Sequence, residues 1–168
     1  ITGTLPDTNI NNASLDNVTG LPAAIATGKV LQVVNANYGT LTNSTTSTWS
    51  DTGLTASITP SSASNKILVF ANMIGLSKNG ADTYMGLRLL RGASEIFLFE
   101  TQAGYTAGSG FNSWGSDALN YLDSPSTTSS TTYKVQFRNV PATGTVTVND
   151  GSGLNGSTIT LMEIAVWL

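Results

Sequence analysis

Apolar and polar residues alternate most regularly between residues 131 and 138. Tyr133, Val135 and Phe137 occupy every second position, and the residues between them are polar. Successive side chains of a β-strand point to opposite faces, so this period of two predicts a strand with one buried and one solvated face. We therefore expect these three residues in a hydrophobic core, and the preceding Ser/Thr-rich residues 124–132 in a neutral connection rather than a binding site.

Similar apolar segments recur along the chain, separated by turn residues at the spacing of about 8–12 positions that is typical of all-β domains. No segment shows a convincing helical period. The pattern predicts an antiparallel β-sandwich or jelly roll of about 8–9 strands. The predicted strands are residues 29–35, 54–58, 66–76, 83–91, 95–102, 119–123, 133–138, 145–148 and 158–168.

Two of these strands carry further expectations about their neighbours. Residues 95–102 are apolar on both faces, so we expect the strand to be covered on both sides. Residues 145–148 follow the turn 141–144, and we expect them to pair across it with the preceding strand.

The last predicted strand changes its apolar face part-way along. Ile159 and Leu161 share one face, and Met162 and Ile164 then continue the pattern on the other. A β-bulge or a second buried face would produce this change. The chain also ends in an apolar Val-Trp-Leu sequence, which we expect to be buried against other copies of the chain.

Residues 1–27 differ from the predicted domain, residues 28–168. Their apolar residues are too sparse to form a core, and the motif Thr-Gly-Thr-Leu-Pro at residues 2–6 returns as Thr-Gly-Leu-Pro 17 residues later. Such a repeat suits a fibre shaft in which neighbouring chains bury the isolated apolar residues. A flexible linker is the alternative. Because the chain begins with Ile1 rather than Met, we expect it to be a fragment of a longer polypeptide.

The composition excludes several classes of chemistry. The chain has no Cys and no His, which removes disulfides, thiol nucleophiles and the commonest metal ligand and general base. Charged residues make up only 10%, whereas Ser, Thr, Asn and Gly supply 76 of the 168 residues. This hydroxyl- and amide-rich surface suits hydrogen bonding to sugars, or serves equally as a neutral coat.

Charge and hydropathy also limit the partners. The formal net charge is −3, and the seven Lys and Arg residues do not cluster, so we expect no nucleic-acid partner. No apolar run approaches the roughly 20 residues that span a bilayer, so we expect no membrane insertion.

The carboxylates form no recognisable catalytic pair. Glu95 and Glu100 have an odd separation on one predicted strand, which places them on opposite faces. We expect Asp117 and Asp123 to be solvated or to cap turns. The Asn149–Gly153 sequence lacks the acidic ligands of a calcium-binding EF-hand loop and predicts a turn. We therefore expect no catalytic residues, no metal and no cofactor, and a protein that is not an enzyme.

The segment 103–116 is the strongest candidate for recognition. It is predicted to be irregular, is rich in Gly, and carries three aromatic residues. Exposed aromatic side chains on such loops provide rigid contact area for a ligand. The predicted receptor-binding residues are Tyr105, Phe111, Asn112 and Trp114. The alternative is that the aromatic rings pack into the core or into a subunit interface.

Several segments together resemble the distal domain of tail-fibre proteins of tailed bacteriophages, especially those of marine and cyanobacterial hosts. The segments that carry the resemblance are residues 28–34, 54–62, 65–69, 122–125, 132–136 and 157–164. The resemblance covers roughly residues 28–168, and residues 1–27 are similar to the repetitive shafts that precede such domains.

This resemblance implies a homotrimeric fibre tip on the virion, joined to upstream fibre or tail proteins, that binds a receptor on the host surface, often a glycan. Two alternatives remain open from the residues. One is a purely structural head fibre or decoration protein of the virion. The other is a secreted carbohydrate-binding β-sandwich.

Overall fold

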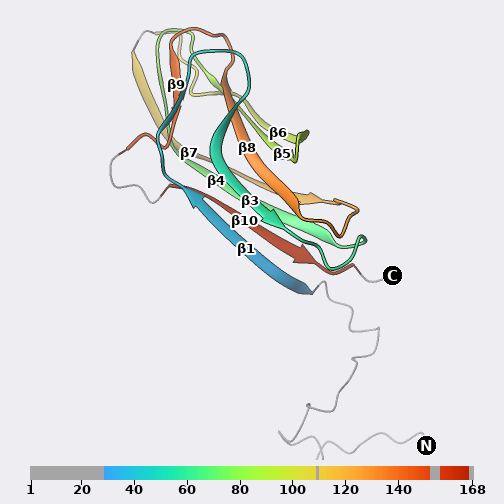
Figure 1. Cartoon of the computed structure of the whole chain (residues 1–168). Coiled ribbons are helices and arrows are strands. Elements are labelled where there is room, and N and C mark those ends of the chain that lie inside the picture. Colours follow the sequence, from blue (N-terminus) through green and yellow to red (C-terminus); the bar gives the residue numbers. More distant parts are fainter. Residues whose placement is uncertain (1–28, 109, 152–155, 167–168) are drawn as a thin grey trace, which may run out of the picture.

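The computed structural model describes residues 29–108, 110–151 and 156–166, and within them the chain is all-β with no helix (Figure 1). The predicted all-β class is therefore confirmed. Ten strands follow in chain order: β1 (Val30–Tyr38), β2 (Thr42–Ser44), β3 (Ser50–Ile58), β4 (Lys66–Asn79), β5 (Met85–Arg91), β6 (Ser94–Ala103), β7 (Phe111–Asp123), β8 (Thr131–Asn139), β9 (Thr145–Val148) and β10 (Ser157–Ile164).

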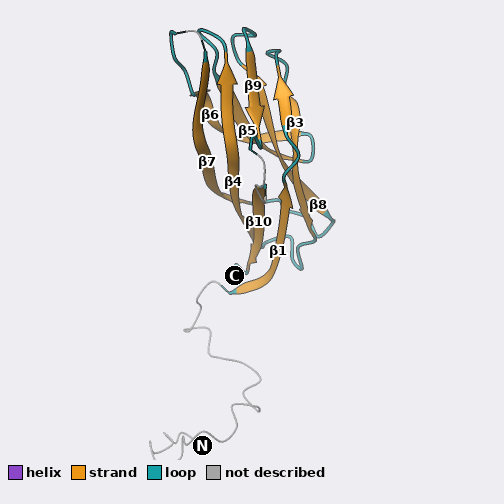
Figure 2. Ribbon diagram, turned by 90° about the vertical axis from the view of Figure 1, so that its left-hand side faces the viewer, coloured by secondary structure: helices purple, strands orange, loops and turns teal. Residues whose placement is uncertain are grey.

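The strands form two antiparallel sheets that pack face to face (Figures 1 and 2). Sheet B is β3-β8-β5-β6. Sheet A is built on the long strand β4, which pairs along one edge with β7. The other edge of β4 pairs first with β10 and then, after a gap, with β9. Strand β1 continues the sheet beyond β10, and β2 continues it beyond β9.

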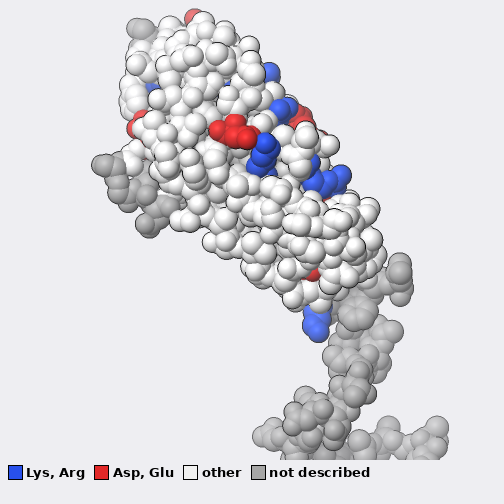
Figure 3. All heavy atoms as spheres, viewed as in Figure 1, with Lys and Arg blue, Asp and Glu red and all other residues white. Residues whose placement is uncertain are grey.

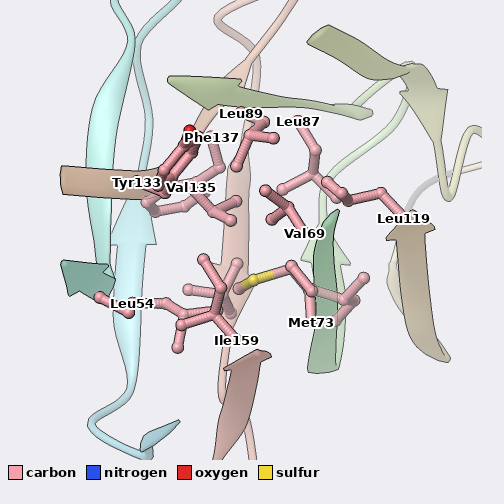
Figure 4. Packing of buried hydrophobic residues seen from close by; sticks show 14 of the residues in the cluster. Leu54, Val69, Met73, Leu87, Leu89, Leu119, Tyr133, Val135, Phe137 and Ile159 are labelled. Carbon is pink, nitrogen blue, oxygen red and sulfur yellow. The ribbon is translucent and has the colours of Figure 1, made fainter. Parts of the chain in front are cut away.

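The core lies between the two sheets, and β8 contributes the residues that its alternation predicts. Tyr133, Val135 and Phe137 are completely buried, as expected. Figure 4 shows them meeting apolar side chains from both sheets. The other core residues labelled there are Leu54, Val69, Met73, Leu87, Leu89, Leu119 and Ile159.

The hydroxyl group of Tyr133 ends in a buried polar cluster. It donates to Asp123 at 2.6 Å, and Arg91 donates to both oxygens of the same carboxylate at 2.9 Å. Burial and the hydrogen bond to Asp123 raise the pKa of Tyr133 far above its usual value. The expectation that Asp123 is solvated or caps a turn was therefore wrong, because the end of β7 places it over β5 and β8, at 5% exposure.

Strand β6 is not covered on both sides, contrary to expectation. It forms the edge of sheet B, and Phe97 and Leu98 are 36% and 42% exposed. Phe97 stacks on Tyr121 of β7 at 5.2 Å between ring centroids. The apolar residues on both faces of β6 thus reflect an edge position where the two sheets meet, rather than a strand enclosed by other elements.

Strand β9 pairs with β2 and β4 in sheet A, not with β8 in sheet B. The predicted hairpin was therefore wrong, and the turn 141–144 carries the chain from one sheet to the other. Asn139 holds this turn by donating from its side chain to the carbonyls of Thr143 and Gly144, at 2.7 and 3.1 Å. Ala142 and Gly144 both adopt positive φ, which bends the chain away from the continuation a hairpin needs.

Strand β10 keeps one inward face throughout, so neither a bulge in it nor a change of face explains its apolar pattern. The inward residues are Ile159, Leu161 and Glu163, all fully buried. The irregularity in pairing lies in β1, between Val30 and Gln32. The sequence pattern misled because a glutamate occupies an inward position.

Glu163 is held by neutral hydrogen-bond donors. Its carboxylate accepts from Asn65 at 2.6 Å, from both the backbone and the hydroxyl of Ser61 at 2.7 Å, and from Gln32 at 2.6 Å. Burial raises the pKa of the carboxyl group, but these hydrogen bonds outweigh it and lower the pKa from 4.5 to about 2. The anion therefore fastens β10 to β1 and to the connection between β3 and β4.

The two ends of the described domain, Lys29 and Val166, lie at the same end of the sandwich (Figures 1 and 2). Ala165 donates from its backbone to the carbonyl of Lys29 at 2.9 Å. The predicted shaft or linker and the predicted burial of Trp167 and Leu168 concern residues outside the described part.

The lowered pKa of Glu163 predicts how stability responds to acid. The folded protein holds this carboxyl deprotonated between pH 4.5 and about 2, where the unfolded chain binds a proton. The stabilisation is therefore complete above pH 4.5 and is lost as the pH falls through about 2. Glu163→Gln should lose about 1–3 kcal/mol at pH 7. In urea unfolding, the difference in free energy of unfolding between the wild type and Glu163→Gln should decrease towards pH 2. A difference that is independent of pH would contradict this.

Candidate functional site

Two loops meet at the end of the sandwich opposite Lys29 and Val166 (Figure 1). One connects β4 to β5, and the other connects β6 to β7. The backbone of Asp82 donates to the carbonyl of Thr106 at 3.1 Å, and that of Gly80 donates to the carbonyl of Gly110 at 3.3 Å. These bonds make the two loops one structural unit.

A buried lysine supports this unit from inside the domain. Lys78 is 1% exposed, and its Nζ donates to the carbonyl of Gly80 at 2.7 Å and to the hydroxyl of Thr106 at 2.5 Å. No carboxylate pairs with it among the described residues. A buried cation needs hydrogen-bond partners, and both partners of the Lys78 ammonium lie on these loops, so Lys78 holds the two loops together.

Tyr105 lies on the second loop and is 46% exposed. Its ring meets Tyr84 edge to face at 5.8 Å, and its hydroxyl donates to Asp82 at 3.1 Å. That hydrogen bond and the negative charge of Asp82 raise the pKa of the phenol. Tyr105 is thus accessible, but its polar group already has a partner within the protein.

The other three predicted residues belong to strand β7, because the irregular segment ends at Gly110 rather than at residue 116. Phe111 is 67% exposed. Asn112 faces the opposite way and donates to the carbonyl of Gly104 at 3.3 Å. Trp114 follows Asn112 in phase and packs against the core. Alternation along the strand therefore separates Phe111 from Asn112 and Trp114.

Trp114 is positioned by what lies beneath and beside it. A Cβ atom at Gly104 would come within 2.1 Å of the indole ring, so the ring occupies the space that a side chain would need. The indole N–H donates to Asp117 at 3.2 Å. Burial raises the pKa of Asp117 despite that hydrogen bond. Trp114 thus supports the loop from the inside, as in the alternative interpretation of the sequence.

Phe111 borders an open hollow of about 300 Å³ on the outer side of sheet A. The hollow crosses β2, β9, β4 and β7, where the strand register sets Asn43 opposite Thr147 and sets Asn79 opposite both Thr145 and Phe111. Its lining residues are Leu41, Asn43, Ser77, Lys78, Asn79, Phe111, Thr145, Thr147 and Asp150. We call this feature the sheet A hollow.

Hydrogen bonds between side chains hold several polar groups of the sheet A hollow in place. Thr147 donates from its hydroxyl to Asn43 at 2.8 Å, and Ser77 donates to the carboxylate of Asp150 at 2.6 Å. Two exposed apolar side chains, Phe111 and Leu41, stand at its border. A surface that combines fixed hydroxyl, amide and carboxylate groups with an aromatic ring can bind a sugar, whose hydroxyls need hydrogen bonds and whose C–H faces need apolar contact.

Asp150 is brought to the hollow by the irregular centre of β4. Gly75 has a positive φ of 58°, and a Cβ there would lie 2.6 Å from the backbone of Asp150. The space allows Asp150 to donate from its backbone to the carbonyl of Gly75 at 2.8 Å. Glycine is therefore required both for the conformation and for the close approach.

Asp150 is the one carboxylate among the described residues that line the hollow, whereas glycoside hydrolysis uses a pair. No group of three or more potential metal ligands occurs in the described part of the chain. No helix among the described residues is long and apolar enough to cross a membrane.

Sequence reasoning identified Phe111 but missed its neighbours in the hollow. Asn43, Ser77, Thr147 and Asp150 are distant in sequence and carry no shared motif. Only the register of four strands brings them together. The chain matches no protein-family model and no curated protein.

Gly104 offers a test of how Trp114 is held. Gly104→Ala should lower stability by about 1–3 kcal/mol, because the new methyl group meets the indole ring and the residue has positive φ. Gly108→Ala is the control, since nothing lies within 4 Å of a Cβ there. Thermal unfolding and the near-ultraviolet circular dichroism of tryptophan would report the difference. Equal stability of the two variants would contradict this packing.

Proposed function

We propose that this chain is a non-enzymatic recognition domain that binds a neutral saccharide in the sheet A hollow. The observation that carries the proposal is the composition of the hollow: hydroxyl and amide groups held in place by mutual hydrogen bonds, bordered by the exposed ring of Phe111. Pre-ordered polar groups bind at a lower entropic cost than mobile ones.

The position of the hollow favours a role at the tip of a larger assembly. It lies in the half of sheet A formed by β9 and β2, away from the end that holds Lys29 and Val166 (Figure 2). Together with the sequence resemblance, this favours a jelly-roll tip of a bacteriophage tail fibre that adsorbs to a glycan on the host surface. A virion head fibre with the same hollow is the second candidate.

An apolar area on the other half of sheet A supports the proposed homotrimer. Facing residues Val33, Met162, Leu68 and Leu122 form a row across β1, β10, β4 and β7. Val33 and Leu122 are 55% and 51% exposed, and Phe70 lies beside the row at 41%. Exposed apolar residues gathered on one face mark a contact surface.

A second copy of the chain is the partner that this face fits best. Its outward positions are uncharged except for Lys66. When identical surfaces associate, residues near the symmetry axis lie close to their own copies, so like charges there repel each other. A neutral apolar face therefore suits self-association. Lys29 adjoins this face, so association there would also suit the interpretation of residues 1–27 as a fibre shaft.

Substitutions in the hollow test the proposed recognition. Phe111→Ala and Thr147→Val should each weaken binding to immobilised neutral polysaccharides by about tenfold, or 1.4 kcal/mol. Phe97→Ala removes an exposed aromatic ring from the edge of sheet B and is the matched control. Surface plasmon resonance would measure the affinities. Unchanged binding by both hollow variants would rule out this site.

Charges on the apolar face test the proposed assembly. The wild-type chain should be a homotrimer by light scattering, and Val33→Asp combined with Leu122→Asp should yield monomers because the face then carries like charges. Leu98→Asp on the edge of sheet B should remain trimeric. A wild-type monomer would refute the assembly without affecting the saccharide test. A monomer only after removal of residues 1–27 would assign association to that segment instead.

A further inference from the structure

The outer face of sheet B carries most of the paired charges of the domain. Figure 3 shows charged side chains gathered in a band on one flank, beside a surface that is otherwise largely uncharged. Lys134 and Gln136 both donate to Asp51, at 3.0 and 2.6 Å. Gln136 in turn accepts from Arg88, which donates to Glu95 at 2.9 Å. These contacts form one continuous hydrogen-bond network across β3, β8, β5 and β6.

Arg138 differs from every other arginine of the protein. Arg88 and Arg91 each pair with a carboxylate, whereas the side chain of Arg138 has no carboxylate partner and no hydrogen bond among the described residues. Its Nε is buried and has no partner. In this network, Asp51 balances the charge of Lys134, and Glu95 balances that of Arg88. Arg138 therefore leaves one uncompensated positive charge in a protein of net charge −3.

Trp49 lies beside this charge. The guanidinium carbons of Arg138 and Arg88 are 4.5 and 4.4 Å from the centre of its ring. The absence of a side chain at Gly86 makes room for the indole, since a Cβ there would be 3.3 Å from it. Glu95 already balances the charge of Arg88, so an anion bound beside this ring would offset the charge of Arg138.

We propose that Trp49 and Arg138, with Arg88 as the second cation, form a binding site for the carboxylate of an acidic saccharide. The guanidinium group of Arg138 presents planar paired N–H donors that match a carboxylate, and the indole of Trp49 holds that group in place. Trp49 is half-buried, and Arg88 retains about a fifth of its side-chain exposure. This site is on the opposite sheet from the sheet A hollow, and the proposal does not depend on saccharide binding in that hollow.

Binding of oligogalacturonate, a chain of carboxylated sugars, tests this site in the 168-residue chain. Isothermal titration calorimetry should show saturable binding that weakens with added salt, and no binding of the methyl-esterified oligomer. Arg138→Gln should reduce the affinity by about tenfold or more. Lys134→Gln is the matched control, because it removes the same charge from the same face but from a residue that is paired with Asp51.

Each outcome decides the proposal. Arg138→Lys keeps the charge but loses the planar donor pair, so it should bind oligogalacturonate more weakly than the wild type and more tightly than Arg138→Gln. If Arg138→Gln does not fold, Arg138→Lys alone tests the role of the guanidinium group. Phe111→Ala should bind oligogalacturonate normally even where it loses neutral saccharides. Equal losses in Lys134→Gln and Arg138→Gln, equal binding of the methyl ester, or no saturable binding would overturn the site.

Discussion

The pairing of β4 with three other strands is the constraint on which the rest of the structure depends. One edge of β4 follows β7 along nearly its whole length, while the other changes partner from β10 to β9. The change occurs at Gly75, where the backbones of Asn149 and Asp150 bind β4 directly, at 3.0 and 2.8 Å. A side chain at Gly75 would collide with that backbone. The outer face of sheet A carries the apolar row where β4 pairs with β10, and it carries the hollow where β4 pairs with β9.

The few charges of the domain are used in two ways. Inside, Glu163 and Lys78 are satisfied by neutral hydrogen bonds rather than by opposite charges, and each joins segments that are distant in sequence. On the outer face of sheet B, Lys134 pairs with Asp51 and Arg88 pairs with Glu95, whereas Arg138 has no carboxylate partner among the described residues. A buried ion without partners would cost several kcal/mol, so these networks specify how strands and loops meet.

Local alternation was enough to predict the fold class and much of the core. Tyr133, Val135 and Phe137 are buried as their period of two predicts. Their burial requires only that the facing sheet covers them, and it does not depend on which strands pair with β8. Strand partners were not predictable in the same way. The hairpin expected before Thr145 fails because Asn139 and Ala142 turn the chain into the other sheet, and that depends on tertiary contacts.

The same limit applies to the candidate site. Phe111 was identifiable as an aromatic residue near glycines, but its separation from Trp114 follows from strand phase that the glycine-rich sequence hides. A direct measurement is the mapping of backbone amide shifts by nuclear magnetic resonance during titration with a neutral oligosaccharide that the protein binds. The account predicts shifts centred on Asn43, Ser77, Phe111 and Thr147. Shifts confined to sheet B or to the end near Lys29 would contradict it.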